Sequence, residues 1–111
     1  MFVGVLRLSL HLPGNGSLKG KRKIIRSVIE RTRAKFNASV AEVADNDLHQ
    51  RAVMGATVVG NNASHVDAML GNIGRFVENL GVAPVTTVET EVIPLGGEIG
   101  RDPNLGEEDE W

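Results

Sequence analysis

The sequence contains no cysteine. This absence excludes disulfide bonds, zinc sites built on thiolates and catalysis by a thiol nucleophile, and it fits a reducing compartment. Aromatic residues make up only 4% of the chain, with three Phe, one Trp and no Tyr. The core must therefore be aliphatic, and a surface that reads RNA bases by stacking them on aromatic rings is not expected.

Long apolar runs are missing as well. No stretch approaches the roughly 20 apolar residues of a membrane-spanning helix. The N-terminus begins with an alternating pattern, without the cationic start and apolar run of a signal peptide. We therefore expect a cytoplasmic protein without a membrane partner. Its 111 residues, 41% of them hydrophobic, suffice for one domain with a real core.

Charge is distributed unevenly along the chain. Eight of the twelve Lys and Arg residues fall within residues 19–35, where Glu30 is the single acidic residue. Residues 98–111 contain six acidic residues and one Arg. We predict a folded domain over residues 1–95 and an acidic, disordered tail over 96–111. The tail either aids solubility or competes with an external anion for the basic segment.

Hydrophobic periodicity predicts six elements. Strands are expected over residues 2–12, 38–44, 52–60 and 84–95, and helices over residues 17–36 and 64–80. Ser17 is the expected N-cap of the first helix, Ser64 with Asp67 forms the expected capping box of the second, and Gly81 ends the second. The β-α-β-β-α-β order with right-handed crossovers predicts a ferredoxin-like α/β (α+β) sandwich, in which two helices cover one face of an antiparallel four-stranded sheet.

Five cations of the first helix form a stripe beside its apolar face, at about 100° per residue. They are Lys19, Arg22, Lys23, Arg26 and Arg33. Lys21 falls within the apolar arc, and we expect its stem to follow the core edge while its ammonium reaches water. Such a cluster neutralises phosphates and gives salt-dependent binding. We assign RNA or phosphate binding to the stripe together with Lys21; the alternative is a solvated outer face.

No catalytic constellation is visible in the sequence. His11 and His65 each lack a serine or carboxylate partner at a spacing that indicates nucleophilic catalysis. The Gly14-x-Gly16 pair lacks the spacing of a phosphate-binding loop. We therefore predict a protein without enzymatic activity, cofactor or metal.

The segment after the second expected strand allows three interpretations. Asp45, Asp47 and His49 alternate, so on extended backbone they would point one way and offer a metal site. The acids could instead accept backbone amides in a polar connector. In the third interpretation Arg51 pairs with Asp45 or Asp47 and fixes a hairpin, which we favour over the metal site.

A second functional interpretation concerns the sheet face that the helices leave open. Alternation places Arg7, Ser9 and His11 of the first strand on this face, beside Glu89 and Glu91 of the last. Mixed charges of this kind suit pairing across a two-fold axis. The alternative function is therefore a homodimeric protein-interaction module that binds no nucleic acid.

Two motifs carry a resemblance to a known family. They are GVLRLSLHLPGNGSLKGKR and FNASVAEVADNDLHQRAVMG, and they resemble the YlxP-like family of small bacterial proteins of unassigned function over roughly residues 1–95. The resemblance implies the ferredoxin-like fold. Because members tend to be encoded near translation and ribosome-maturation genes, it also implies a role near RNA or the ribosome.

The resemblance also marks motif residues, whose role in the family is unknown. They are Ser17, Leu18, Lys19, Lys21 and Arg22, then Glu42, Asp45, Asp47, Gln50 and Arg51. His49 stands where Trp is common in the family, so a contact that depends on that aromatic ring is altered here. From residues and resemblance together, we predict an accessory protein that contacts RNA or the ribosome through its basic helix.

Overall fold

The computed structural model describes residues 1–12, 14, 16–45 and 48–96. The elements along the chain are β1 (Phe2–His11), α1 (Leu18–Lys35), β2 (Ser39–Ala44), β3 (Arg51–Gly60), α2 (Ala63–Leu80) and β4 (Val85–Pro94). This order confirms the predicted β-α-β-β-α-β fold. Apart from Gly96, the predicted acidic tail lies outside the described residues.

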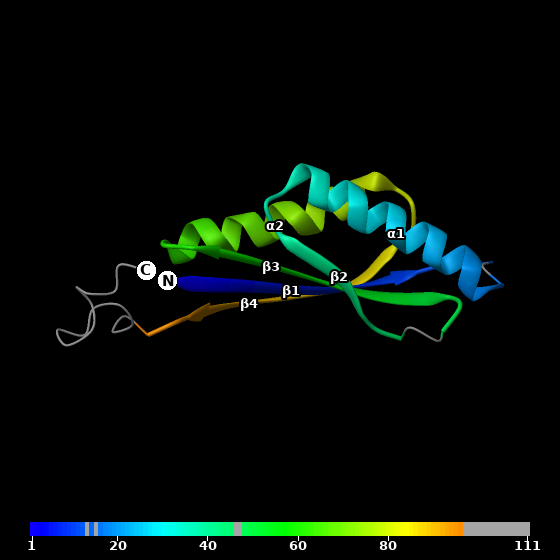
Figure 1. Cartoon of the computed structure of the whole chain (residues 1–111), viewed down its shortest axis with the longest axis horizontal. Coiled ribbons are helices and arrows are strands. Elements are labelled where there is room, and N and C mark those ends of the chain that lie inside the picture. Colours follow the sequence, from blue (N-terminus) through cyan, green and yellow to red (C-terminus); the bar gives the residue numbers. More distant parts are fainter. Residues whose placement is uncertain (13, 15, 46–47, 97–111) are drawn as a thin grey trace, which may run out of the picture.

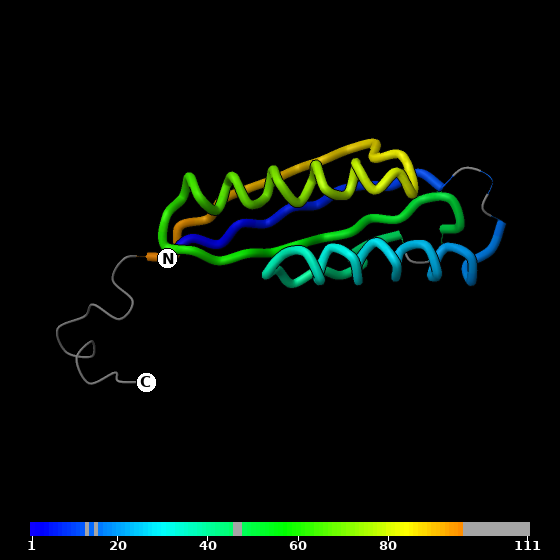
Figure 2. Tube along the Cα trace, turned by 90° about the horizontal axis from the view of Figure 1, so that it is seen from above, coloured from blue at the N-terminus to red at the C-terminus, as the bar shows by residue number. Residues whose placement is uncertain are grey.

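The four strands form one antiparallel sheet in the order β2-β3-β1-β4. Both helices cover the same face of this sheet and leave the other face open (Figure 1). Seen from above, α1 and α2 lie side by side, with α1 on the β2 side (Figure 2). No helix among the described residues is long and apolar enough to cross a membrane.

The core lies between the sheet and the two helices, and it is aliphatic, as the composition predicts. Every second residue of the central strand β1 points toward the helices, and these side chains are fully buried: Leu6, Leu8 and Leu10. They pack against the apolar stripe of α2, formed by Val66, Leu70, Ile73 and Val77. Alternate side chains of β1 thus pack against side chains that recur every three or four residues on α2, and together they form a single core layer.

The helix ends confirm one predicted cap and correct another. The Ser17 hydroxyl accepts a hydrogen bond from the Gly20 amide at 3.0 Å, as expected for an N-cap. The predicted Ser64 cap of α2 is wrong: the helix begins at Ala63, and the Asn62 side chain accepts from the His65 amide at 3.0 Å. Gly81 ends α2 in the left-handed conformation, with a φ of 65°.

The start of α2 lies unusually close to the sheet because two glycines make room for it. A Cβ atom on Gly4 of β1 would lie 2.5 Å from Cγ1 of Val66. A Cβ atom on Gly60 of β3 would lie 2.9 Å from Cγ2 of the same valine. Val66 therefore sits in a notch that these two glycines leave, and this contact fixes the position of α2 over the sheet.

Candidate nucleic-acid interface

Helix α1 has a buried face and an outward face, and both follow from its sequence. Its fully buried residues recur at spacings of four, three and four, which keeps them on one side of the helix: Lys21, Ile25, Val28 and Thr32. The Thr32 hydroxyl donates to the Val28 backbone oxygen at 2.7 Å, which satisfies it inside the core. The opposite side of α1 is free to carry charge.

The outward face of α1 carries a shallow groove between its side chains. Its lining comes from α1 alone: Lys19, Arg22, Lys23, Arg26, Ser27, Glu30 and Arg31. Five of these residues are cations and one, Glu30, is a carboxylate. All six charged residues are exposed. The sequence therefore predicted the stripe correctly as a surface feature, and we call this lining the basic groove.

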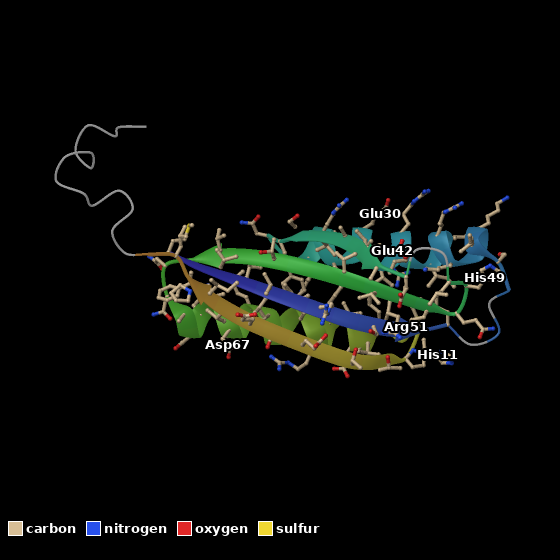
Figure 3. All side chains as sticks on the ribbon, turned by 90° about the horizontal axis from the view of Figure 1, so that it is seen from below. His11, Glu30, Glu42, His49, Arg51 and Asp67 are labelled. Carbon is tan, nitrogen blue, oxygen red and sulfur yellow. The ribbon has the colours of Figure 1, made fainter. Side chains whose placement is uncertain are left out.

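The basic groove runs along most of the length of α1. Lys19 and Arg26 are seven residues apart, about 10 Å along the helix axis, and Arg31 extends this by about a further 7 Å. Glu30 lies on the outer side of α1, away from the sheet (Figure 3). Its carboxylate offsets part of the positive charge toward the C-terminal end of the groove.

Arg33, the last cation of the predicted stripe, has a structural contact. Its Nη2 donates a hydrogen bond of 2.8 Å to the backbone oxygen of Val40 on β2. The residue remains exposed at the surface, but part of its guanidinium is committed to holding α1 against the sheet edge. Arg33 therefore belongs less to the groove than Arg22 or Arg26.

The expectation that the Lys21 ammonium reaches water is wrong. Lys21 is only 1% exposed, and its Nζ lies 3.1 Å from Oε2 of Glu42 on β2. Nζ also donates to the backbone oxygen of Asp45. Because Lys21 sits in the middle of the buried face of α1, its side chain meets β2 before it meets solvent. Lys21 is thus a structural residue, and we remove it from the residues that contact an external phosphate.

The chain between β2 and β3 adopts the third of the predicted arrangements. Arg51 Nε lies 2.9 Å from Oδ2 of Asp45, so this ion pair ties the end of β2 to the start of β3. Asp45 has a φ of 58° and its backbone oxygen accepts from the Leu48 amide. The Gln50 backbone oxygen accepts from the Leu12 amide, which joins the hairpin to the end of β1. These motif residues therefore shape one end of the molecule.

The metal interpretation of this segment has no support among the described residues, which hold no group of three His, Asp or Glu side chains placed to bind an ion. Asp47, one of its expected ligands, lies outside the described residues. His49 is exposed and engaged in a contact. His11 and Arg51 are paired in register, and both lie at this end of the sheet (Figure 3).

The open face of the sheet carries a second charged pair. Arg7 Nε donates to Oε1 of Glu89 at 2.8 Å, and both side chains are more than half exposed. This hydrogen bond, aided by the opposite charges, raises the pKa of Arg7 and lowers the pKa of Glu89 from their ordinary values. The expected polar face is confirmed here, except that Ser9 is buried. The Ser9 hydroxyl accepts a hydrogen bond from the Thr87 hydroxyl at 3.0 Å.

A model of the family described as "Protein of unknown function (DUF503)" matches residues 3–90 of this chain. The chain belongs to this family. It is also similar to the uncharacterized protein YlxP of Bacillus subtilis (strain 168), at 29% identity over 76 residues, which cover 68% of this chain and 83% of that protein. The resemblance to the YlxP-like family is thus confirmed, and DUF503 is a family of unknown function.

Two solved structures are similar to this DUF503 chain at low scores. One is a candidate antibiotic biosynthesis monooxygenase from Deinococcus radiodurans, with 16% identity, a TM-score of 0.45 and coverage of 86% of this chain and 93% of that one. The other is the cofactor-independent oxygenase SnoaB from Streptomyces nogalater, mutant N63A, with 12% identity, a TM-score of 0.41 and coverage of 85% and 91%. These scores are too low to support an argument about activity.

Two features of this region were not predicted from the sequence. One is Arg31, which lines the basic groove although it lies outside the predicted stripe. The other is the pairing of Lys21 with Glu42. A signal for that pair was present, because Lys21 falls on the apolar arc of the helix and Glu42 alternates with the buried Val40 on β2. Opposite charges at two positions where the hydrophobic pattern predicts buried apolar residues indicate a buried ion pair.

Proposed function

We propose that this DUF503 protein is a non-enzymatic accessory protein that contacts the phosphate backbone of RNA, in free form or in the ribosome, through the basic groove of α1. The observation that supports the proposal is the groove itself, where five exposed cations and one carboxylate share the outward face of a single helix. Cations that neutralise phosphates release condensed counterions, and this release drives association.

The composition of the surface favours contact with the backbone over reading of bases. Sheets that bind single-stranded RNA stack bases on exposed aromatic rings. In the described part of this chain the aromatic side chains pack on the helix side instead: Phe36 and Phe76 form an edge-to-face pair at 5.4 Å, and Phe2 packs against the core. The expected ligand is therefore structured RNA, bound with weak sequence preference.

Cosedimentation with ribosomal subunits and with free ribosomal RNA tests this proposal. The full-length protein should be retained at low salt and lost at moderate salt. The variant Arg22→Gln/Arg26→Gln removes two cations at the centre of the groove and should be retained much more weakly. The variant Lys35→Gln/Arg75→Gln is the matched control, since it removes two exposed cations that do not line the groove.

Retention of the groove variant equal to that of the control variant would contradict the proposal, because a phosphate contact through α1 cannot survive the loss of its central cations unchanged. Absence of retention for the full-length protein at low salt would contradict it as well. In that case the groove would be a solvated helix face.

A second candidate function is a protein-interaction module that binds no nucleic acid and pairs through the open face of the sheet. The observation in its favour is the mixed character of that face. Apolar side chains such as Val59, 62% exposed, share it with the Arg7–Glu89 pair. Exposed apolar side chains that gather on one face mark a candidate protein-interaction surface.

A further inference from the structure

We infer that a second copy of this chain covers the open face of the sheet, and that Arg7 of each copy pairs with Glu91 of the other. The inference rests on the second candidate function, which it makes specific by naming the partner and the contact. It does not depend on RNA binding through α1.

The open face has apolar surface at both of its sides. At one end, strand register places Val59, Val3 and Ile93 next to one another across β3, β1 and β4. On the β2 side, Val43 is 54% exposed and borders a hollow over Gly55. The Val43 side chain packs directly over Gly55, since a Cβ atom on Gly55 would lie 3.0 Å from Val43 Cγ1. Both sides of the face therefore offer apolar side chains against which a second sheet could pack.

The charges at the centre of the face are arranged for self-pairing. Arg7 lies opposite Glu89 in the register of β1 and β4, and Glu91 lies two residues further along β4, on the same face. Arg7 binds Glu89 through Nε, whereas a guanidinium has five N–H donors in all. Glu91 has no cation partner among the described residues.

A second copy related by a two-fold axis would supply a cation for Glu91 and a second carboxylate for Arg7. In such an interface, a contact from residue i to residue j is repeated from j to i. One new pair, Arg7 with Glu91, would therefore be formed twice. It would give each Arg7 a second carboxylate and each Glu91 its missing cation.

The extent of the face suffices for a specific dimer. Strand residues advance about 3.3 Å each, and neighbouring strands lie about 4.8 Å apart, so the strands of this sheet cover about 600 Å². Two copies would bury about 1,200 Å² in total if the face is treated as flat. This area is at the lower end of the range for stable interfaces. An RNA strand fits the face poorly, because two carboxylates and one guanidinium lie at its centre.

Sedimentation velocity of the RNA-free, full-length protein from low to high micromolar concentration tests the inference. The protein should sediment as a dimer that dissociates on dilution. The variant Glu91→Lys should associate at least about tenfold more weakly, since it places a cation against Arg7 of the partner. Glu78→Lys makes the same charge change on the exposed side of α2 and should associate like the natural protein.

The charge exchange Arg7→Glu/Glu91→Lys should restore part of the association relative to Glu91→Lys, because it recreates the pair between copies with reversed signs but also removes the Arg7–Glu89 hydrogen bond within each copy. A protein that stays monomeric at the highest concentration would overturn the dimer. A dimer that Glu91→Lys leaves unchanged would overturn the Arg7–Glu91 contact. Neither result affects the RNA proposal, because the experiment contains no RNA and the groove is unaltered.

Discussion

The buried ammonium of Lys21 shows how strongly one residue can depend on its partner. Taking a charge out of water costs several kcal/mol, and only a close counter-charge and hydrogen bonds offset that cost. Lys21 has both, from Glu42 at 3.1 Å and from the backbone oxygen of Asp45. The two residues are unequal, however, because the side chain of Glu42 is 18% exposed whereas that of Lys21 is 1% exposed.

This asymmetry gives a stability prediction. Glu42→Ala should lower the free energy of unfolding by about 3–5 kcal/mol, because it leaves an uncompensated charge in the core. Lys21→Met should cost less, because the Glu42 side chain that remains is partly exposed, although its Oε2 atom is buried. The double variant Lys21→Met/Glu42→Leu should recover most of the stability. Urea denaturation measures all three.

Lys19→Met serves as the control for these variants, since it removes an exposed cation two residues away and should change the free energy of unfolding by less than about 0.5 kcal/mol. If Glu42→Ala were as stable as this control, the buried ion pair would not exist in solution.

The Arg7–Glu89 pair gives a prediction about protonation. The hydrogen bond from Arg7, together with its charge, lowers the pKa of Glu89 below the ordinary value of 4.5. A lowered pKa means that the pair stabilises the folded protein above the pKa of the unfolded chain, and that this contribution is lost as the pH falls through the lowered value. Arg7→Gln should therefore raise the pKa of Glu89, as measured by NMR titration of its carboxyl carbon. An unchanged pKa would show that the pair is not formed in solution.

At the scale of a single residue, the sequence predicted the position of Lys21 on the helix but not its environment. Helical spacing alone placed it within the apolar arc. Whether its ammonium reaches water depends on which part of β2 lies beneath α1, and that register is set by tertiary packing. The Asp45–Arg51 pair was predictable as one alternative, because the two residues flank a short connector that brings two antiparallel strands together.

The helix ends yield a prediction at the scale of elements. Asn62→Ala removes the side chain that caps α2 and should lower the free energy of unfolding by about 0.5–2 kcal/mol. Ser64→Ala changes a residue inside the first turn of the helix and should cost less than about 0.5 kcal/mol. Thermal or urea denaturation compares the two variants. A larger loss for Ser64→Ala than for Asn62→Ala would place the start of α2 at the position that the capping-box pattern indicates.

All six elements were predictable because each carries several residues of one period, and their ends agree with the expected ranges to within one residue. The start of α2 was misplaced because Asn62 and Ser64 are both good caps. The local sequence does not rank them; in the structure Asn62 is the cap, and Val66 one turn later packs over Gly4 and Gly60. That contact joins three elements, so no local pattern contains it.

At the scale of the whole molecule, the two proposed surfaces lie apart from one another. The basic groove faces away from the sheet on α1, and the proposed dimer interface is the sheet face on the opposite side from the helices (Figure 1). A face-to-face dimer would therefore carry one basic groove on each outer side. Two grooves on one particle would bind a large RNA more tightly than one groove binds alone, provided that both reach it.

The sequence predicted both surfaces in outline. Clustered cations on one helical stripe define the groove without any tertiary information. The apolar part of the open face was not predicted, because Val59, Val43 and Ile93 read as ordinary strand residues. Only the strand register shows that they share a face with Arg7 and Glu91.

The central claim is that cations of the α1 groove bind phosphates, and the salt dependence of RNA affinity tests it most directly. The slope of log K against log salt concentration should become shallower by about 1.4–1.8 in Arg22→Gln/Arg26→Gln, since each phosphate contact contributes about 0.7–0.9. Lys21→Met and Lys35→Gln/Arg75→Gln should keep the slope of the natural protein, because neither changes the groove. A slope that is equal in the natural protein and the groove variant would contradict the account.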